Sequence, residues 1–207
     1  MIYELEDTGI GYREDDLLYP VREDSILLLR ATTEILKKSE GRFMEMGCGN
    51  GIVSLTASYY KWETYCVDRE PRALGNLRGN LKMNGLEGHL LLSDLFEGIP
   101  RGLKSSFTLM VFNPPYLPEN DYTLDRRDDF PLVGGEKGYE ISINFLKGAR
   151  NYLMEGGDLI LIAVDERDWI SGIRGIDLEG LRYDGILSSG DAGDHKLLAL
   201  RFRKNHR

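Results

Sequence analysis

Cysteine and histidine are scarce in this sequence of 207 residues, which contains two cysteines and three histidines. Two cysteines cannot build a disulfide framework, and by themselves they cannot complete a four-ligand zinc site. The histidines His89, His195 and His206 are scattered, and none has a ligand partner at a metal-binding spacing. The sequence therefore predicts no metal site.

Long apolar runs and an excess of basic residues are also missing. No run approaches the roughly 20 apolar residues that span a bilayer, and the acidic start of the chain lacks the apolar core of a secretory signal. Lys and Arg number 26 against 34 Asp and Glu, a formal net charge of -8, whereas proteins that act on phosphate backbones usually carry a basic surplus. We therefore expect a cytoplasmic protein with no membrane partner, and nucleic acid is the less favoured substrate.

The sequence does contain a regular alternation of short apolar runs and helical patterns. The length and a hydrophobic content of 42% suit one globular domain over 1–207, with 1–20 as an N-terminal extension. Hydrophobic periodicity predicts helices and strands. The predicted helices span 24–38, 52–60, 70–83 and 139–154, and the predicted strands span 42–46, 64–68, 89–94, 107–113, 158–164, 182–187 and 196–203.

This order predicts an α/β fold with seven strands. Strands that alternate with helices form a mostly parallel sheet with helices on both faces. The last two strands are joined by about eight turn-rich residues, which is too short for a crossover helix, so they should form an antiparallel hairpin.

A glycine-rich segment, Gly47-Cys48-Gly49-Asn50-Gly51, lies between the first main strand and a helix. Glycine lets the backbone approach a ligand closely and adopt a positive φ. The spacing is G-x-G-x-G, which differs from the G-x-G-x-x-G of a dinucleotide site. Glu45 precedes the segment, and its carboxylate would repel a pyrophosphate. It would suit a ligand with an ammonium group, such as S-adenosylmethionine (SAM).

Two further acids end neighbouring predicted strands. Asp68 ends the second strand, where it can accept both ribose hydroxyls, and Asp94 ends the third, where it can accept the adenine amino group. Ligands of open α/β sheets bind at the carboxyl ends of the strands. The acids and the glycine segment together predict a nucleoside site, and a tight turn beside unrelated strand ends is the alternative.

The turn Asn113-Pro114-Pro115-Tyr116 follows the fourth predicted strand, which we expect beside the first. The Asn113 side-chain oxygen and the Pro114 carbonyl can accept the two N–H groups of a substrate NH₂ and stabilise charge that develops on its nitrogen. Pro115 stiffens the turn, and Tyr116 offers a flat face to an amide or a base. The alternative is a rigid loop entry with no chemical role.

Together these motifs resemble class I SAM-dependent methyltransferases that modify amino groups. Two further segments narrow the likeness to the HemK-like glutamine methyltransferases, closest to their short archaeal and eukaryotic branch. One is Tyr-Pro-Val-Arg-Glu-Asp-Ser over 19–25, in which Pro20 comes one residue earlier than that family leads us to expect. The other is Gly-Gly-Glu-Lys-Gly over 134–138.

The resemblance implies a Rossmann-like class I methyltransferase fold and SAM as the cofactor. It implies that the substrate is the glutamine of a Gly-Gly-Gln loop in a translation release factor. It also implies that Asn113, Pro114 and Tyr116 are catalytic, and that the cofactor site contains Glu23, Ser25, Glu45, Gly47, Cys48, Gly49, Gly51, Asp68, Asp94, Leu95 and Asn113.

Two segments bear on partners. The stretch 117–136 lacks periodicity and carries six acidic residues against two arginines, so we expect a binding loop that favours a cationic polypeptide, with a solvated loop as the alternative. The three leucines at 90–92 lie in a strand expected at a sheet edge. Helices could cover the faces of this strand, or a small zinc-binding activator subunit, as in related enzymes, could pair with its edge.

Two rival functions stay open. An amino-group methyltransferase of adenine or guanine in RNA or DNA would use the same Asn-Pro-Pro-Tyr turn. A non-catalytic SAM-binding scaffold would have no use for Asn113.

Overall fold

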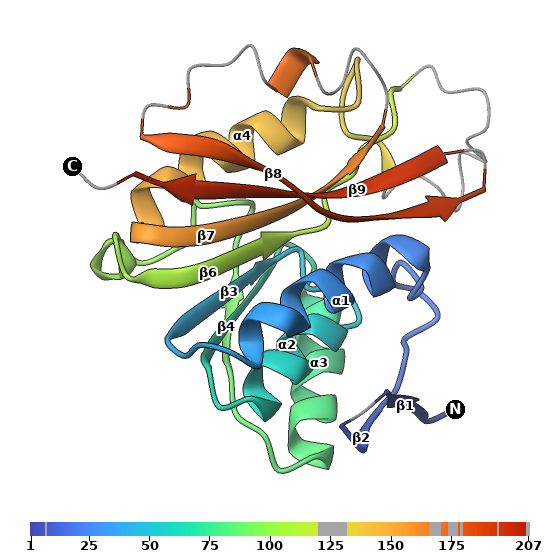
Figure 1. Cartoon of the computed structure of the whole chain (residues 1–207). Coiled ribbons are helices and arrows are strands. Elements are labelled where there is room, and N and C mark those ends of the chain that lie inside the picture. The colour runs from blue at the N-terminus through green and yellow to red at the C-terminus, as the bar shows by residue number, and fades with distance from the viewer. Residues whose placement is uncertain are drawn as a thin grey trace.

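The computed structural model describes residues 1–6, 8–119, 132–165, 171–173, 178, 180–193 and 195–205. Seven strands form one sheet in the order β5-β4-β3-β6-β7-β9-β8. The pairs from β5 to β7 are parallel, and β9 runs antiparallel to both of its neighbours. The predicted parallel sheet with a C-terminal antiparallel hairpin is confirmed (Figure 1).

The elements have the following bounds. The main sheet contains β3 (Arg42–Met46), β4 (Glu63–Asp68), β5 (His89–Leu92), β6 (Phe107–Phe112), β7 (Leu153–Val164), β8 (Leu181–Ala192) and β9 (His195–Lys204). The helices are α1 (Glu23–Leu36), α2 (Ile52–Tyr59), α3 (Pro71–Met83), α4 (Glu140–Tyr152) and the short 3₁₀ helix η1 (Arg101–Leu103). A separate hairpin contains β1 (Tyr3–Leu5) and β2 (Ile10–Tyr12).

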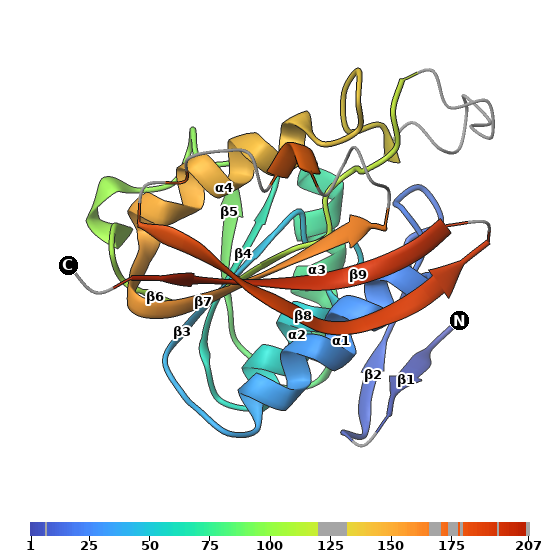
Figure 2. The same ribbon diagram turned by 45° about the horizontal axis from the view of Figure 1, so that its top comes forward.

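Helices cover both faces of the sheet, as expected. Helices α1, α2 and α3 lie on one face and α4 lies on the other (Figures 1 and 2). A strand covered on both faces carries apolar residues in succession rather than in alternation. In β6, Leu109, Met110 and Val111 are accordingly all fully buried.

The register of the central strands brings the two main motifs together. Strand β6 pairs with β3, so that Met46 lies opposite Phe112. The glycine segment follows Met46 and Asn113 follows Phe112. The first and fourth predicted strands are therefore neighbours, and the two motifs meet at the carboxyl ends of parallel strands.

The C-terminal hairpin is longer than predicted. Residues 188–192 look like a turn in sequence, but they extend β8 to Ala192, where Ala192 pairs with His195 of β9. These small and polar residues pair with residues 195–199 of β9. The pairing with a neighbouring strand overrides their turn propensity. Two other boundaries also differ: β5 ends at Leu92, two residues before Asp94, and β7 begins at Leu153.

The first residues form a hairpin and a strap that the periodicity does not predict. Two asparagines, one on α3 and one directly after it, hold this segment, and each bonds both the backbone N–H and the backbone C=O of one strap residue. Asn84 accepts from Gly11 N at 3.1 Å and donates to Gly11 O at 2.7 Å, and Asn80 makes the same pair of bonds to Arg13 at 2.9 Å each. Asn50 of the glycine segment donates to Tyr19 O at 2.9 Å. These bonds place residues 17–21 beside the glycine segment.

Among the described residues, no helix is long and apolar enough to cross a bilayer. The same part of the chain contains no cluster of His, Cys, Asp and Glu that could hold a metal ion.

Candidate active site

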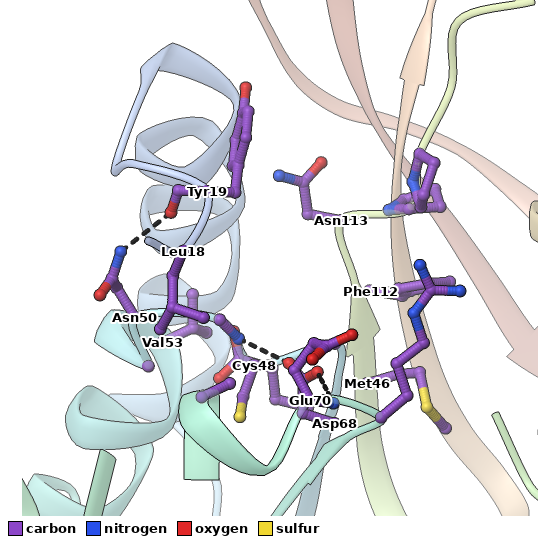
Figure 3. A pocket seen from close by; sticks show the side chains of 18 of the residues that line it. Leu18, Tyr19, Met46, Cys48, Asn50, Val53, Asp68, Glu70, Phe112 and Asn113 are labelled. Carbon is purple, nitrogen blue, oxygen red and sulfur yellow. Dashed lines mark hydrogen bonds between the residues drawn. The ribbon is translucent and has the colours of Figure 1, made fainter. Parts of the chain in front are cut away.

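A cavity of about 980 Å³ lies at the carboxyl ends of β3, β4 and β6, beside the first turn of α1. Figure 3 shows Tyr19 and Asn50 on one side of it, Phe112 on the other, and Asp68 near its floor. The predicted site residues that line it are Ser25, Glu45, Gly47, Cys48, Gly49, Gly51, Asp68, Asp94, Leu95, Asn113 and Pro114.

The three glycines of the loop all have positive φ, but only two of them are also closely packed. A Cβ added at Gly47 would lie 2.9 Å from Phe112 Cε2, and one added at Gly51 would lie 2.5 Å from Leu77 Cδ1. A Cβ added at Gly49 would meet nothing within 4 Å. The outer two glycines are therefore needed for packing, whereas Gly49 leaves open space beside the cavity.

Asp68 holds the glycine loop in place. Its Oδ2 accepts a hydrogen bond from Gly49 N at 2.9 Å, and its Oδ1 accepts one from Glu70 N at 2.9 Å (Figure 3). The side chain still lines the cavity. A carboxylate can accept about four hydrogen bonds, so these two leave Asp68 with capacity for a ligand.

Glu45 is buried at the end of β3, where its carboxylate accepts from Ser54 N at 2.8 Å and from Ser54 Oγ. Burial raises the pKa of Glu45 to about 8, and the bonds from Ser54 oppose this shift. The sequence led us to expect a carboxylate open to a cationic ligand. In the structure it already binds α2, because β3 points it at the first residues of that helix.

The loop after β5 completes this side of the cavity. Ser93 Oγ donates to Leu95 O at 2.8 Å and accepts from Gly98 N at 2.8 Å. These bonds hold Leu95 at a φ of 44°, an uncommon value for a residue other than glycine. Asp94 is exposed within this loop.

Asn113 carries the most distinctive polar group of the site. Its Nδ2 donates to Asp24 Oδ2 at 3.0 Å. Its Oδ1 is buried and has no hydrogen-bond partner among the described residues. In Figure 3 the amide nitrogen lies on the side of Tyr19 and the oxygen on the opposite side. An unpaired buried carbonyl is unfavourable unless a ligand supplies a donor.

Asp24 lines the cavity, and the sequence analysis did not assign it to the site. It is 1% exposed, and its Oδ2 also accepts from Tyr19 Oη at 3.1 Å and from Tyr116 Oη at 3.2 Å. Burial and then the nearby Asp24 carboxylate raise the pKa of both phenols, so both stay protonated donors at neutral pH. The signal was present, because Asp24 lies inside the 19–25 motif, between the two residues assigned to the cofactor.

Two predicted site residues lie elsewhere. Glu23 is exposed and is not among the residues that line the cavity, because it begins α1 and faces solvent. Tyr116 is 5% exposed and does not line the cavity. Its ring is packed in the core and its hydroxyl donates to Asp24, so in this structure Tyr116 presents no flat face to the cavity.

The second glycine run packs against the backbone of the Asn-Pro-Pro-Tyr turn. A Cβ on Gly134 would lie 2.5 Å from Pro115 O, and one on Gly138 would lie 2.5 Å from Tyr116 O. Gly134 N also donates to Leu117 O at 2.8 Å. These close approaches need glycine. The predicted acidic binding loop falls mainly on 120–131, outside the described residues.

Cys48 lines the cavity but is 5% exposed, and burial raises the pKa of its thiol. A thiol with a raised pKa is a poor nucleophile at neutral pH, which favours a packing role.

Comparisons with known proteins agree with this geometry. Residues 23–130 match the family model described as Methyltransferase small domain. A proposed protein N5-glutamine methyltransferase of Methanocaldococcus jannaschii is 35% identical over 159 residues, which cover 76% of this chain and 76% of that protein. A release factor glutamine methyltransferase of Deinococcus radiodurans is 32% identical over 166 residues, which cover 76% of this chain and 58% of the relative.

A solved methyltransferase structure from Pyrococcus furiosus has the same fold, with a TM-score of 0.72 over 97% of this chain and 92% of that one, at 18% identity. The family model spans more than half of the chain, and both relatives exceed 30% identity. The chain therefore belongs to the methyltransferase small domain family, and within it to the SAM-dependent methyltransferases of the HemK-like glutamine methyltransferase group.

Proposed function

We propose that this protein methylates the side-chain amide nitrogen of a glutamine in a translation release factor. The observation that carries the proposal is the Asn113 carbonyl oxygen, which is buried and lacks a partner within the described residues. An acceptor of this kind suits a substrate NH₂ group. The names of the relatives, which assign N5-glutamine and release factor methylation to those proteins, support the choice of a protein amide.

The residues of the cavity fit SAM. The space beside Gly49 lets a ligand approach the loop backbone, so we assign Gly47, Gly49 and Gly51 to its methionine end. Asp68 keeps acceptor capacity for the ribose hydroxyls, and the exposed Asp94 can accept from the adenine amino group. When bound, SAM supplies an electrophilic methyl group. Ser25, Cys48 and Leu95 complete the lining.

The chain itself orients and stabilises the reacting nitrogen. An amide nitrogen is a poor nucleophile because its lone pair is delocalised into the carbonyl. Asn113 Oδ1 and the Pro114 carbonyl can accept its two N–H bonds and favour a pyramidal nitrogen. As that nitrogen gains positive charge these bonds strengthen, so the acceptors stabilise the transition state more than the ground state.

The outer edge of β5 is a candidate docking site for an activator subunit. Strand β5 ends the sheet, and no described residue pairs with its free edge. Leu92 at the end of this strand is 57% exposed. An unpaired apolar edge can bind a partner by strand addition. Leu90 and Leu91 of the same strand are partly buried against the core, so the chain itself covers part of the faces of β5, and the open edge is what supports the proposal of a small zinc-binding partner.

Labelled SAM tests both proposals. The purified chain is incubated with release factor, transfer RNA, ribosomal RNA or duplex DNA, each with and without a candidate activator, and mass spectrometry locates the methyl group. We expect the label on the Gly-Gly-Gln glutamine, with more of it when the activator is present. Label on an adenine or guanine instead would favour the nucleic-acid alternative, against which the net charge of -8 counts. Equal labelling with and without the activator would contradict the β5 docking site.

A further inference from the structure

Asp24 gathers donors that come from three separate parts of the chain. Its Oδ2 accepts from Tyr19 in the N-terminal strap and from Asn113 and Tyr116 in the turn after β6. Its Oδ1 accepts from Ser25 N at 2.7 Å within α1. The carboxylate therefore connects the first turn of α1 to the turn that carries the proposed nitrogen acceptor.

This arrangement determines which way the Asn113 amide faces. A carboxylate only accepts hydrogen bonds, so the Asn113 group beside Asp24 must be the NH₂. The opposite rotamer would place the amide oxygen against the carboxylate oxygen at about the 3.0 Å that now separates donor and acceptor. Like partial charges at that distance repel, so Asp24 keeps Asn113 Oδ1 on the side away from itself.

The same contact acts on the charge of the amide. A buried negative group at the NH₂ end polarises the amide and increases the negative charge on its oxygen, because hydrogen bonds in series strengthen one another. Hydrogen bonds from Tyr19, Asn113, Tyr116 and both the backbone and the hydroxyl of Ser25 already surround the Asp24 carboxylate, so it does not have the free lone pairs of a general base. Its effect on a reacting nitrogen therefore passes through Asn113.

We propose that Asp24 is a positioning residue that orients and polarises the Asn113 amide for the methyl acceptor, with Tyr19 and Tyr116 holding Asp24 in place. This inference rests on the proposed function, because it gives Asn113 the role of nitrogen acceptor. It extends that function to Asp24, which lines the same cavity and acts through Asn113.

The test uses Asp24→Ala, which removes the acceptor, and Asp24→Asn, which keeps the shape and removes the charge. Glu34→Gln is the matched control, because Glu34 is an exposed carboxylate on the same helix that pairs with Lys38. Nitrogen-15 NMR of the protein without substrate follows the Asn113 side-chain NH₂, assigned by its loss in Asn113→Ala. Calorimetry measures SAM affinity, and kcat and KM are measured with whichever acceptor the labelling assay identifies.

In the unaltered protein and in Glu34→Gln we expect Asn113 NH₂ protons that exchange slowly. Asp24→Ala should lose this protection and lower kcat by about 10- to 100-fold, the size of effect expected from misplacing a reacting group, while SAM affinity stays close to that of the unaltered protein. Asp24→Asn should fall between the two, and it also serves if Asp24→Ala does not fold.

Unchanged NH₂ signals in both variants would overturn the proposal, and so would changed signals with an unchanged kcat. Loss of SAM affinity at an unchanged kcat would assign Asp24 to the cofactor site and would also overturn it. The NMR measurement needs no acceptor. If the release factor is not methylated while the signals change as expected, the proposed function fails and the positioning of Asn113 by Asp24 stands.

Discussion

The glycine loop and the Asn-Pro-Pro-Tyr turn follow neighbouring parallel strands and line the same cavity. They differ in whether their polar groups are already hydrogen-bonded within the protein. The acids of the glycine side already bind the protein, Glu45 through Ser54 and Asp68 through Gly49 and Glu70. The turn leaves the oxygen of Asn113 unpaired within the described structure. Under the proposed function, the glycine side binds the cofactor and the turn holds the acceptor for the second substrate.

The largest effect is expected on kcat, from a substitution that changes only the acceptor side of the cavity. Asn113→Ala removes the proposed acceptor and leaves the glycine loop unchanged. We expect kcat to fall by about 10²–10³, as when one preorganised polar group is removed elsewhere, with SAM affinity almost unchanged. Single-turnover rates and calorimetry measure the two quantities. Loss of SAM binding in a folded variant would move Asn113 to the cofactor side, and full activity would show that it is not the acceptor.

On the cofactor side, a matched pair of glycine substitutions distinguishes a glycine needed for packing from one that leaves space for a ligand. Gly49→Ala and Gly51→Ala both force alanine into a positive φ, which is unfavourable by about 1–2 kcal/mol. Gly51→Ala also drives a methyl group into Leu77, and overpacking adds about 1–3 kcal/mol. We therefore expect Gly51→Ala to unfold at clearly lower denaturant.

Gly49→Ala places its methyl group in open space beside the cavity, so it should weaken SAM binding more than it lowers stability. Urea unfolding and calorimetry on both variants check this difference. Equal losses of stability in the two variants would contradict the packing that distinguishes these positions.

The smallest effect, when expressed per pH unit, is a pH dependence of stability on the cofactor side. The pKa of Glu45 rises from 4.5 to about 8 on burial, so between these values the folded state binds more protons than the unfolded state. Stability without SAM should therefore fall as pH rises through this window, by up to about 1.4 kcal/mol per pH unit.

Glu45→Gln keeps an acceptor for Ser54 and removes the titration. The difference in unfolding free energy between the unaltered protein and this variant should change across the window in favour of Glu45→Gln as pH rises. A difference that stays constant between about pH 5 and pH 8 would show that Glu45 is charged in the folded protein throughout.

Much of the fold followed from local patterns. Strands β3, β4 and β6 and helices α2 and α3 lie within a residue or so of their predicted bounds, because an apolar run and its caps are contained in a few consecutive residues. The β1-β2 hairpin and the extension of β8 were missed. Their stability comes from distant partners, Asn80 and Asn84 for the strap and β9 for the end of β8.

For the site, the sequence by itself determined which chemical groups are present: the glycine loop, the acids after β4 and β5, and the Asn-Pro-Pro-Tyr turn. Only the tertiary structure decided how those groups are used. Asp24 lies 89 residues from Asn113 and 92 from Tyr116, so no local pattern shows that it orients Asn113. Likewise, only packing turns Tyr116 inward and brings Glu45 to Ser54, because burial and hydrogen bonding depend on elements that meet when the sheet forms.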